Sequence, residues 1–286
     1  MPDAAYARAR ERLQRFLERD GDRIGVSTRT LAFDHGRRTE HATVLFHGLS
    51  ASPRQLVAIA EGLHARGHNV FVPRLPRHGY RDRHSRALET LDSRQLKACA
   101  ADALEIAHGF GERVHVAGFS LGGLLSCYAG QIAPVHSALA LSPFLGVKFL
   151  PASLRALAAR LALALPNQFY WWDPILRERQ QPDHGYPQYS THAIAHGLSL
   201  ADELFARART EAPAAERLTL VTHRWEPAVN NRAIHKLARL WAASKPGSLE
   251  IVKLRGVPMV HDIVEPKRYP ALAQRVNAQL VEMIDR

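Results

Sequence analysis

The stretch Val114-His115-Val116-Ala117-Gly118-Phe119-Ser120-Leu121-Gly122-Gly123 decides how this chain folds. A short apolar run that favours a β-strand ends at Gly118, and the residues from Leu121 to Ile132 are typical of a helix. A strand that turns into a helix so abruptly brings two backbone segments together. Glycine two residues before and two residues after Ser120 removes the Cβ atoms that would collide there. Gly-x-Ser-x-Gly in this strand–turn–helix setting is typical of a nucleophile elbow.

The composition indicates a globular protein with a large core. The chain has 286 residues, of which 46% are hydrophobic and 23% charged, and its formal net charge is +11. That size and composition suit one α/β domain. The basic residues are scattered, with no Lys/Arg-dense run interleaved with aromatic residues, so we expect no nucleic-acid partner. The positive balance leaves an anionic substrate conceivable.

The cysteines and the apolar runs bear on location. Cys99 and Cys127 are the only cysteines, and neither has His or Cys neighbours at metal-ligand spacing. We therefore expect buried, reduced thiols, no metal site and a cytoplasmic protein. The residues from Met1 to Asp20 lack the apolar core of a secretory signal, and no apolar run is long enough to span a bilayer.

Strands and helices alternate along most of the chain. After a leading helix over 3–20, we expect strands at 26–33, 43–46, 69–72, 113–118, 137–141, 218–222 and 249–254. Helices are expected at 53–66 with Ser52 as N-cap, and at 93–109, 121–132, 200–209, 230–243 and 266–285. This alternation predicts an α/β fold, with a mostly parallel central sheet and helices on both faces. Sites in such sheets form beyond the carboxyl ends of the strands, so the His47-Gly48-Leu49 turn and the Ser120 turn should converge.

The alternation stops between residues 144 and 200. This segment holds a predicted helix near 152–164 and the aromatic cluster Phe169-Tyr170-Trp171-Trp172. We interpret 144–200 as a lid insertion over the active-site mouth, with residues 1–143 and 201–286 as the core. The alternative is that extra helices pack at the sheet edge. As part of a lid, Phe169, Trp171 and Trp172 would bind substrate by giving apolar walls to an acyl or aryl group.

A serine nucleophile needs a base and a group that orients the base. In the elbow fold these partners follow in the order Ser, Asp/Glu, His. His261 lies after the last predicted strand, and Glu226 is the only carboxylate on the loop after the preceding one. Ser120, Glu226 and His261 are therefore the candidate catalytic residues. The alternative for Glu226 is a surface carboxylate paired with Arg224 or Arg232, and Asp262 suits local hydrogen bonding better than catalysis.

An oxyanion hole needs two backbone donors. The amide of Leu121 begins the helix after the elbow, at its positive end. The second donor should come from the first strand–helix loop, where the amide of Leu49 follows His47 and Gly48. His47 has no acid–base role in this scheme and is a candidate structural hydrogen-bonder.

These residues resemble the α/β-hydrolase superfamily from Thr43 to the C-terminus. The carriers are His47-Gly48-Leu49-Ser50, Pro73-Arg74-Leu75-Pro76-Arg77-His78-Gly79, Gly118-Phe119-Ser120-Leu121-Gly122-Gly123, Glu226-Pro227-Ala228-Val229 and Val260-His261-Asp262. Within the superfamily the chain is most similar to the bacterial carboxylesterase, monoacylglycerol-lipase and serine-aminopeptidase-like group. The resemblance implies Ser120 as nucleophile, Glu226 as acid, His261 as base and Leu49 and Leu121 as oxyanion donors, with no metal or organic cofactor. That group commonly has Gly in place of Arg77 and Asp in place of Glu226.

The sequence therefore predicts a serine hydrolase that cleaves small to medium acyl or aryl carboxylic esters through an acyl-enzyme on Ser120. A serine aminopeptidase or amidase is the alternative, for which Asp173, Glu178 and Asp183 are available to bind a substrate amine. A non-catalytic binding protein is the third hypothesis. The expected partner is a small-molecule ester, without nucleic acid or stable membrane insertion.

Overall fold

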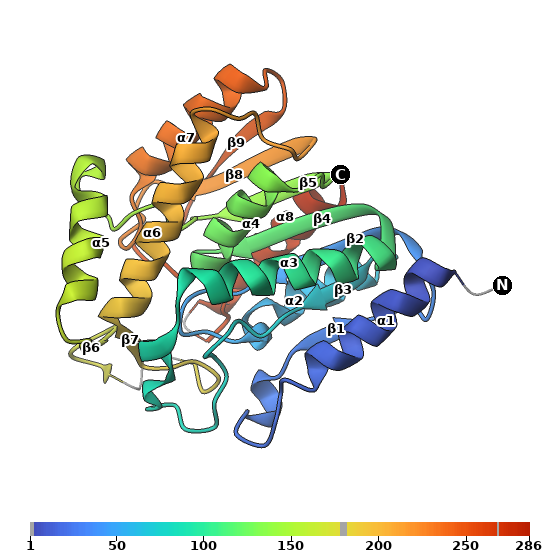
Figure 1. Cartoon of the computed structure of the whole chain (residues 1–286), viewed down its shortest axis with the longest axis horizontal. Coiled ribbons are helices and arrows are strands. Elements are labelled where there is room, and N and C mark those ends of the chain that lie inside the picture. Colours follow the sequence, from blue (N-terminus) through green and yellow to red (C-terminus); the bar gives the residue numbers. More distant parts are fainter. Residues whose placement is uncertain (1–2, 178–181, 268) are drawn as a thin grey trace.

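A seven-stranded sheet forms the centre of the chain (Figure 1). The computed structural model describes residues 3–177, 182–267 and 269–286. The strands lie in the order β1 (Leu31–Phe33), β3 (Asn69–Val72), β2 (Thr39–Phe46), β4 (Gly111–Phe119), β5 (Ser137–Leu141), β8 (Arg217–His223) and β9 (Leu249–Leu254). Every neighbouring pair is parallel except the edge strand β1, which runs antiparallel to β3. The mostly parallel sheet expected from the sequence is confirmed.

Helices cover both faces of this sheet. One face carries α1 (Ala4–Leu17), α3 (Ser93–Phe110), α4 (Leu121–Ile132), α6 (Thr191–Ala208) and α7 (Asn231–Ser244), with α1 packed on α3. The opposite face carries α2 (Val57–His64) and α8 (Pro270–Asp285), which contact each other. Figure 1 shows α3 and α4 in front of the strands and α8 behind them. Successive side chains of a strand enter the two layers in turn: Val44 and Phe46 join the first core and Leu45 the second.

The direction of the chain across the sheet reverses between β2 and β4. After β2 the chain passes through α2 to β3 on one side, whereas from β4 onward it moves to the other side. The connections that follow β2 and β4 therefore diverge and leave a crevice at the carboxyl ends of these strands. Both turns singled out in the sequence, at His47–Leu49 and at Ser120, lie at this crevice.

Between β5 and β8 the chain leaves the sheet. It forms the short helix η4 (Ala152–Leu154), α5 (Arg155–Ala164), a ribbon of β6 (Phe169–Trp171) paired with β7 (Gln188–Ser190), and then α6. In Figure 1 these elements stand to one side of the sheet, with α5 against α6. The helix expected at 200–209 begins earlier, at Thr191, because Ser190 caps it by accepting the Ala193 amide. The role of this segment as a lid stays a prediction.

Two other expectations were wrong in detail. The strand expected at 26–33 is shorter, because only β1 at its end is a strand and Val26–Thr28 forms the 3-10 turn η1. In this turn the Thr28 hydroxyl donates to the Gly25 and Gly79 carbonyls. The helix expected at 53–66 is divided into η2 (Pro53–Leu56) and α2. Ser52 does not cap it, because its hydroxyl is hydrogen-bonded to His184. An unexpected 3-10 helix, η3 (Arg86–Thr90), precedes α3.

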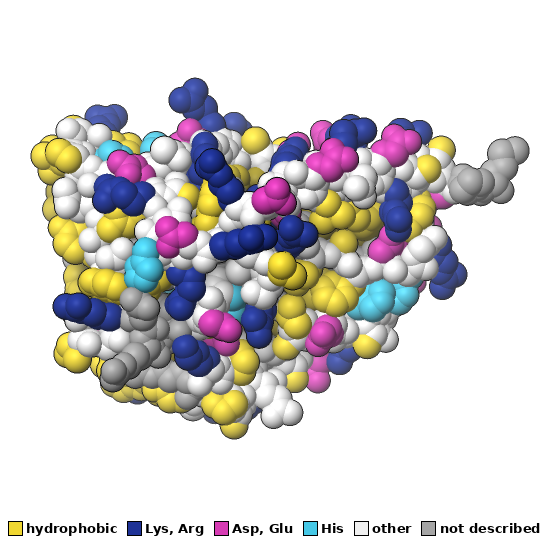
Figure 2. Space-filling view, turned by 90° about the horizontal axis from the view of Figure 1, so that it is seen from below, with side chains coloured by type: hydrophobic (Ala, Val, Ile, Leu, Met, Phe, Trp, Pro, Cys, Tyr) yellow, Lys and Arg dark blue, Asp and Glu magenta, His cyan; other side chains and the backbone are white. Residues whose placement is uncertain are grey.

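None of the helices in the described ranges is long and apolar enough to cross a membrane. On the face of the molecule seen in Figure 2, Lys and Arg side chains lie interspersed with Asp and Glu side chains.

The close approach of α4 to β2 generates a stability prediction. A Cβ atom on Gly122 would overlap the backbone carbonyl of Phe46, which cannot move without disturbing the sheet. We expect Gly122→Ala to lower the free energy of unfolding by about 3 kcal/mol, measured by urea denaturation. Gly21→Ala is the matched control, because a Cβ there meets nothing within 4 Å. Equal stability of the two variants would contradict this packing argument.

Candidate active site

Ser120 lies on a sharp turn between β4 and α4. Its backbone has φ 56° and ψ −112°, a conformation that is unfavourable for a residue with a side chain. The turn is held because the Ser120 amide donates to the Leu141 carbonyl at 3.0 Å and the Ser120 carbonyl accepts from Phe144 at 2.9 Å. A Cβ on Gly118 would overlap the Gly122 carbonyl, which is the collision that the sequence pattern predicted.

His261 joins Ser120 to Glu226. Its Nε2 lies 2.9 Å from the Ser120 hydroxyl, and its Nδ1 lies 2.8 Å from Oε1 of Glu226. A carboxylate only accepts hydrogen bonds, so Nδ1 carries the proton and Nε2 is left to accept from the hydroxyl. The ring packs against Phe119 with 4.8 Å between centroids. The structure thus brings His261 together with Ser120, which lies 141 positions before it in the chain, and with Glu226, which lies 35 positions before it.

Glu226 is buried, and both of its carboxylate oxygens are engaged. Oε1 also accepts the amide of Ala228 at 2.8 Å, and Oε2 is 3.0 Å from Nε2 of His223. Burial alone would raise the pKa of Glu226, but the charge of His261 and the hydrogen bonds from His223, His261 and Ala228 outweigh it, so the pKa lies well below its usual range. The carboxylate therefore stays ionised at neutral pH.

The alternative of a surface ion pair for Glu226 does not fit this arrangement. Its ion-pair partners among the described residues are His223 and His261, and Arg224 instead lies over the Trp225 ring. His223 is a site residue that the sequence did not single out. It is fully buried, and only its position three residues before Glu226 could have drawn attention to it.

The turn after β2 is fixed by two neutral histidines. Nε2 of His47 accepts the Leu75 amide at 3.1 Å, so Nδ1 carries the proton and donates to the Gly48 carbonyl at 2.9 Å. Burial, with a smaller contribution from the charge of His78, holds the pKa of His47 well below its usual value. His78 accepts the Ser50 amide at 3.0 Å, and burial lowers its pKa to about 4. His47 is thus a structural hydrogen-bonder in this fold.

Two backbone amides at the crevice have no acceptor in the part of the chain that the structure describes. Within residues 3–177, 182–267 and 269–286, neither the Leu49 amide nor the Leu121 amide donates a hydrogen bond. The bond from His47 turns the Gly48 carbonyl toward the histidine. The Gly48 carbonyl and the Leu49 N–H belong to one peptide unit, in which the two groups point in opposite directions. The Leu49 amide is therefore turned away from the His47 ring. The Leu121 amide begins α4, where helix N–H groups have no intrahelical partner.

Gln55 ties this turn to the His261 loop. Its side-chain oxygen accepts the Gly48 amide at 2.9 Å, and its side-chain nitrogen donates to Asp262 at 2.7 Å. The other oxygen of Asp262 accepts the amides of Val264 and Glu265. Burial raises the pKa of Asp262, and the hydrogen bond from Gln55 opposes that shift. Sequence reasoning missed Gln55, because its two partners become neighbours only in the folded chain.

A pocket of about 360 Å³ opens above Ser120 and His261. Of the three aromatic residues expected to bind substrate, Trp172 lines it and donates from its indole nitrogen to the Ser50 hydroxyl at 2.6 Å. Phe169 lies under the guanidinium of Arg86, and Trp171 lies edge-on to His84, so their rings have other neighbours.

The segment that carries Trp172 is anchored at the pocket. His184 links the Ser52 hydroxyl, 3.0 Å from Nδ1, to Glu265, 2.7 Å from Nε2. The Tyr186 amide donates to the Ser50 carbonyl at 2.7 Å. Residues of the insertion are thus hydrogen-bonded to both loops that border Ser120.

In the described ranges no group of three or more His, Cys, Asp or Glu side chains is arranged to hold a metal ion. Cys99 and Cys127 are both buried and unpaired with each other, and burial raises the pKa of Cys99 to about 12.

Residues 43–266 match the model of the alpha/beta hydrolase family. No curated protein sequence matches the chain.

Similar solved structures cover nearly the whole chain. A monoglyceride lipase from Saccharomyces cerevisiae, a soluble variant in complex with a substrate analog, has a TM-score of 0.68 at 12% identity, over 90% of this chain and 91% of that one. A monoacylglycerol lipase from Paleococcus ferrophilus has a TM-score of 0.66 at 18% identity, over 89% of this chain and 97% of that one. A structure of the metagenome-derived lipolytic enzymes LipS and LipT has a TM-score of 0.65 at 15% identity, over 91% of this chain and 99% of that one. At these identities the likeness shows the fold.

The lowered pKa of Glu226 generates a prediction about acid stability. Glu226 binds its proton more weakly in the folded chain than in the unfolded one, where the pKa is about 4.3. Its ionised form therefore stabilises the fold above that value, and the stabilisation is lost as the pH falls toward the folded pKa. We expect the free energy of unfolding to fall more steeply between about pH 5 and pH 3 in the wild type than in Glu226→Gln.

Urea denaturation at a series of pH values measures this difference. Glu250→Gln, at an exposed position of β9, is the control and should follow the wild-type curve. If the curves of wild type and Glu226→Gln ran parallel, the carboxylate would not be held ionised as described.

Proposed function

Since the chain belongs to the alpha/beta hydrolase family, we propose that it is a serine hydrolase that cleaves carboxylic esters through an acyl-enzyme on Ser120. The observation that carries this proposal is the unbroken hydrogen-bonded chain from the Ser120 hydroxyl through His261 to Glu226. A serine hydroxyl at neutral pH is a weak nucleophile, and this chain supplies both the base and the group that orients it.

In the proposed reaction Nε2 of His261 takes the proton of Ser120 as the hydroxyl oxygen attacks the ester carbonyl. The ionised Glu226 stabilises the imidazolium that forms. His261 then gives its proton to the departing alcohol, which leaves an acyl group on the serine. The same imidazole deprotonates a water molecule that attacks this acyl-enzyme, and it returns the proton to the Ser120 oxygen as the acid leaves.

The unpartnered amides of Leu49 and Leu121 form the oxyanion hole in this proposal. Both donors are fixed before the substrate arrives, one by the His47–Gly48 hydrogen bond and the other by the start of α4. Each preorganised donor of this kind contributes about 3 kcal/mol to stabilising the transition state.

The pocket supports a small to medium acyl or aryl ester. Its volume of about 360 Å³ is bordered by apolar side chains that include Leu49, Phe119, Trp172 and Val260. We propose that residues 144–200 act as the lid, because Trp172 lines the pocket and His184 is hydrogen-bonded to Ser52 and Glu265 beside it.

The amidase or aminopeptidase alternative has less support. Asp173 accepts the amides of Ile175 and Leu176, and Asp183 is exposed at 3.8 Å from Arg54. Neither lines the pocket above Ser120, and Glu178 lies outside the described residues. Glu265 does line the pocket, but His184 occupies one of its oxygens.

The complete triad favours an enzyme over a binding protein. We further propose a small-molecule ester as the partner and the cytoplasm as the location. The location is supported by two buried thiols that form no disulfide with each other.

Covalent labelling tests the nucleophile. A fluorophosphonate reacts with an activated serine, so we expect one label per molecule of the wild type and no label on Ser120→Ala. The intact mass of each protein measures the labelling. Ser126→Ala is the control, because Ser126 is buried in α4 and donates to the Gly122 carbonyl. Labelling that survives in Ser120→Ala would refute the assignment.

A substrate panel tests the bond that is cleaved. We expect p-nitrophenyl esters of short to medium acids to be hydrolysed at least about 100-fold faster, by kcat/KM, than aminoacyl-p-nitroanilides. An amide leaving group is poorer, and the two acidic side chains that line the pocket, Asp262 and Glu265, are hydrogen-bonded to Gln55 and His184. Anilide turnover with negligible ester turnover would favour the aminopeptidase alternative.

A further inference from the structure

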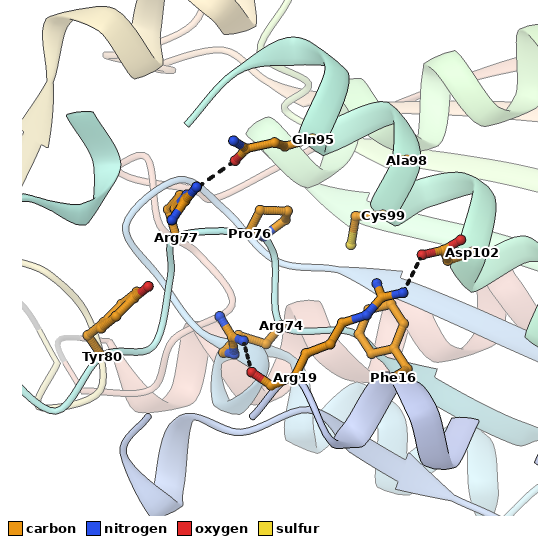
Figure 3. A pocket seen from close by; sticks show the side chains of 10 residues that line it. All are labelled: Phe16, Arg19, Arg74, Pro76, Arg77, Tyr80, Gln95, Ala98, Cys99 and Asp102. Carbon is orange, nitrogen blue, oxygen red and sulfur yellow. Dashed lines mark hydrogen bonds and ion pairs between the residues drawn. The ribbon is translucent and has the colours of Figure 1, made fainter. Parts of the chain in front are cut away.

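A second cleft, of about 400 Å³, lies between the end of α1, the start of α3 and the loop 73–80 (Figure 3). None of its lining residues lines the pocket above Ser120. Three guanidinium groups border it, those of Arg19, Arg74 and Arg77, and apolar surface is supplied by Pro76 and Ala98.

Two of the three arginines are neutralised by carboxylates. Arg74 forms an ion pair with Asp20 at 2.6 Å and also donates to the carbonyls of His78 and Arg19. Arg19 forms an ion pair with Asp102 at 2.8 Å. These two guanidinium groups are therefore balanced in charge.

Arg77 is different. Its Nε donates to the neutral amide of Gln95 at 3.3 Å, and no carboxylate of the described chain pairs with its guanidinium. The cleft thus keeps a net positive charge, on a side chain that is only partly exposed. Figure 3 shows Arg77 beside Gln95 at one end of the cleft, and the Tyr80 hydroxyl turned toward the space between Arg77 and Arg74.

The backbone of Arg77 adopts an unusual conformation. Its φ of 67° lies in the left-handed region, which glycine adopts without cost and other residues disfavour. Such conformations concentrate at functional sites. Of the five described non-glycine residues with a positive φ, Ser50 and Ser120 line the active-site pocket and Arg77 lines the cleft, whereas Ser142 and Arg177 line neither. An arginine at this position is disfavoured by its backbone, so a use for its side chain would explain its presence.

We propose that this cleft binds a small organic phosphate, with the phosphate oxygens on the guanidinium of Arg77 and the carbon body against Pro76 and Ala98. The planar fork of an arginine matches two phosphate oxygens and is charged at all accessible pH values. The Tyr80 hydroxyl is turned toward the same space and adds a donor. The volume exceeds what inorganic phosphate needs, and the apolar surface suits an organic group.

Titration calorimetry with phenyl phosphate tests the proposal on three proteins: the wild type, Arg77→Gly and Arg177→Gly. Glycine relieves the left-handed backbone at position 77, so this variant should fold at least as stably as the wild type, which its melting temperature checks. Arg177 is the matched control, because it has the same side chain and a positive φ of 49°, but it does not line the cleft.

We expect wild type and Arg177→Gly to bind phenyl phosphate equally, and Arg77→Gly to bind it at least about tenfold more weakly at the same ionic strength. Inorganic phosphate should bind the wild type more weakly than phenyl phosphate, because it lacks the apolar body. Equal binding by Arg77→Gly, no binding by the wild type above a chloride control, or tighter binding of benzoate than of phenyl phosphate would each overturn the proposal.

Discussion

The structure depends on one close contact, between the start of α4 and the end of β2. Gly122 lies against the Phe46 carbonyl so closely that no side chain fits between them. This contact forces the chain to turn from β4 into α4 through Ser120 alone, which is why Ser120 adopts a positive φ. The hydroxyl is then presented above the sheet at the point where the strand order reverses. Packing in the core thus determines where the proposed nucleophile stands.

The two loops that border Ser120 are joined to each other as well as to the sheet. Gln55 bonds the Gly48 amide on one side and Asp262, next to His261, on the other. His184 makes a parallel link from Ser52 to Glu265. A shift of the His261 loop would therefore be transmitted to the turn that carries Leu49. The proposed base and oxyanion donor are held in one frame, as preorganised catalysis requires.

Sequence reasoning succeeded where the signal is local. The elbow, the strands Ser137–Leu141 and Leu249–Leu254, and the helix Leu121–Ile132 follow from glycine spacing and apolar runs. It expected Ser120, Glu226 and His261 to meet because topology brings the ends of parallel strands together, and the three side chains do form one hydrogen-bonded chain. Their catalytic roles stay a prediction.

The sequence was less informative where contacts are distant or polar. β2 begins at Thr39, four residues before the expected strand, because its polar first residues pair with the start of β4 and show no apolar pattern. Gln55 and Asp262 are 207 residues apart, and no local feature links them. The neighbours of Phe169 and Trp171 were likewise decided by how the ribbon folds back, which composition does not determine.

The acid of the proposed triad shows how buried polar contacts compensate for a longer side chain. Glutamate has one more rotatable bond than aspartate, so its carboxylate has more positions to lose on folding. Here the amides of Ala228 and Val229 and the ring of His223 restrict it, and Oε1 is left facing His261. Because His223 is wholly buried, removing its ring would take away a hydrogen-bond donor to the carboxylate inside the core. His223 is hydrogen-bonded to Glu226 and not to His261 or Ser120, so it acts on the orientation of His261 through the carboxylate. A glutamate can serve as the acid here because His223 donates to its second oxygen.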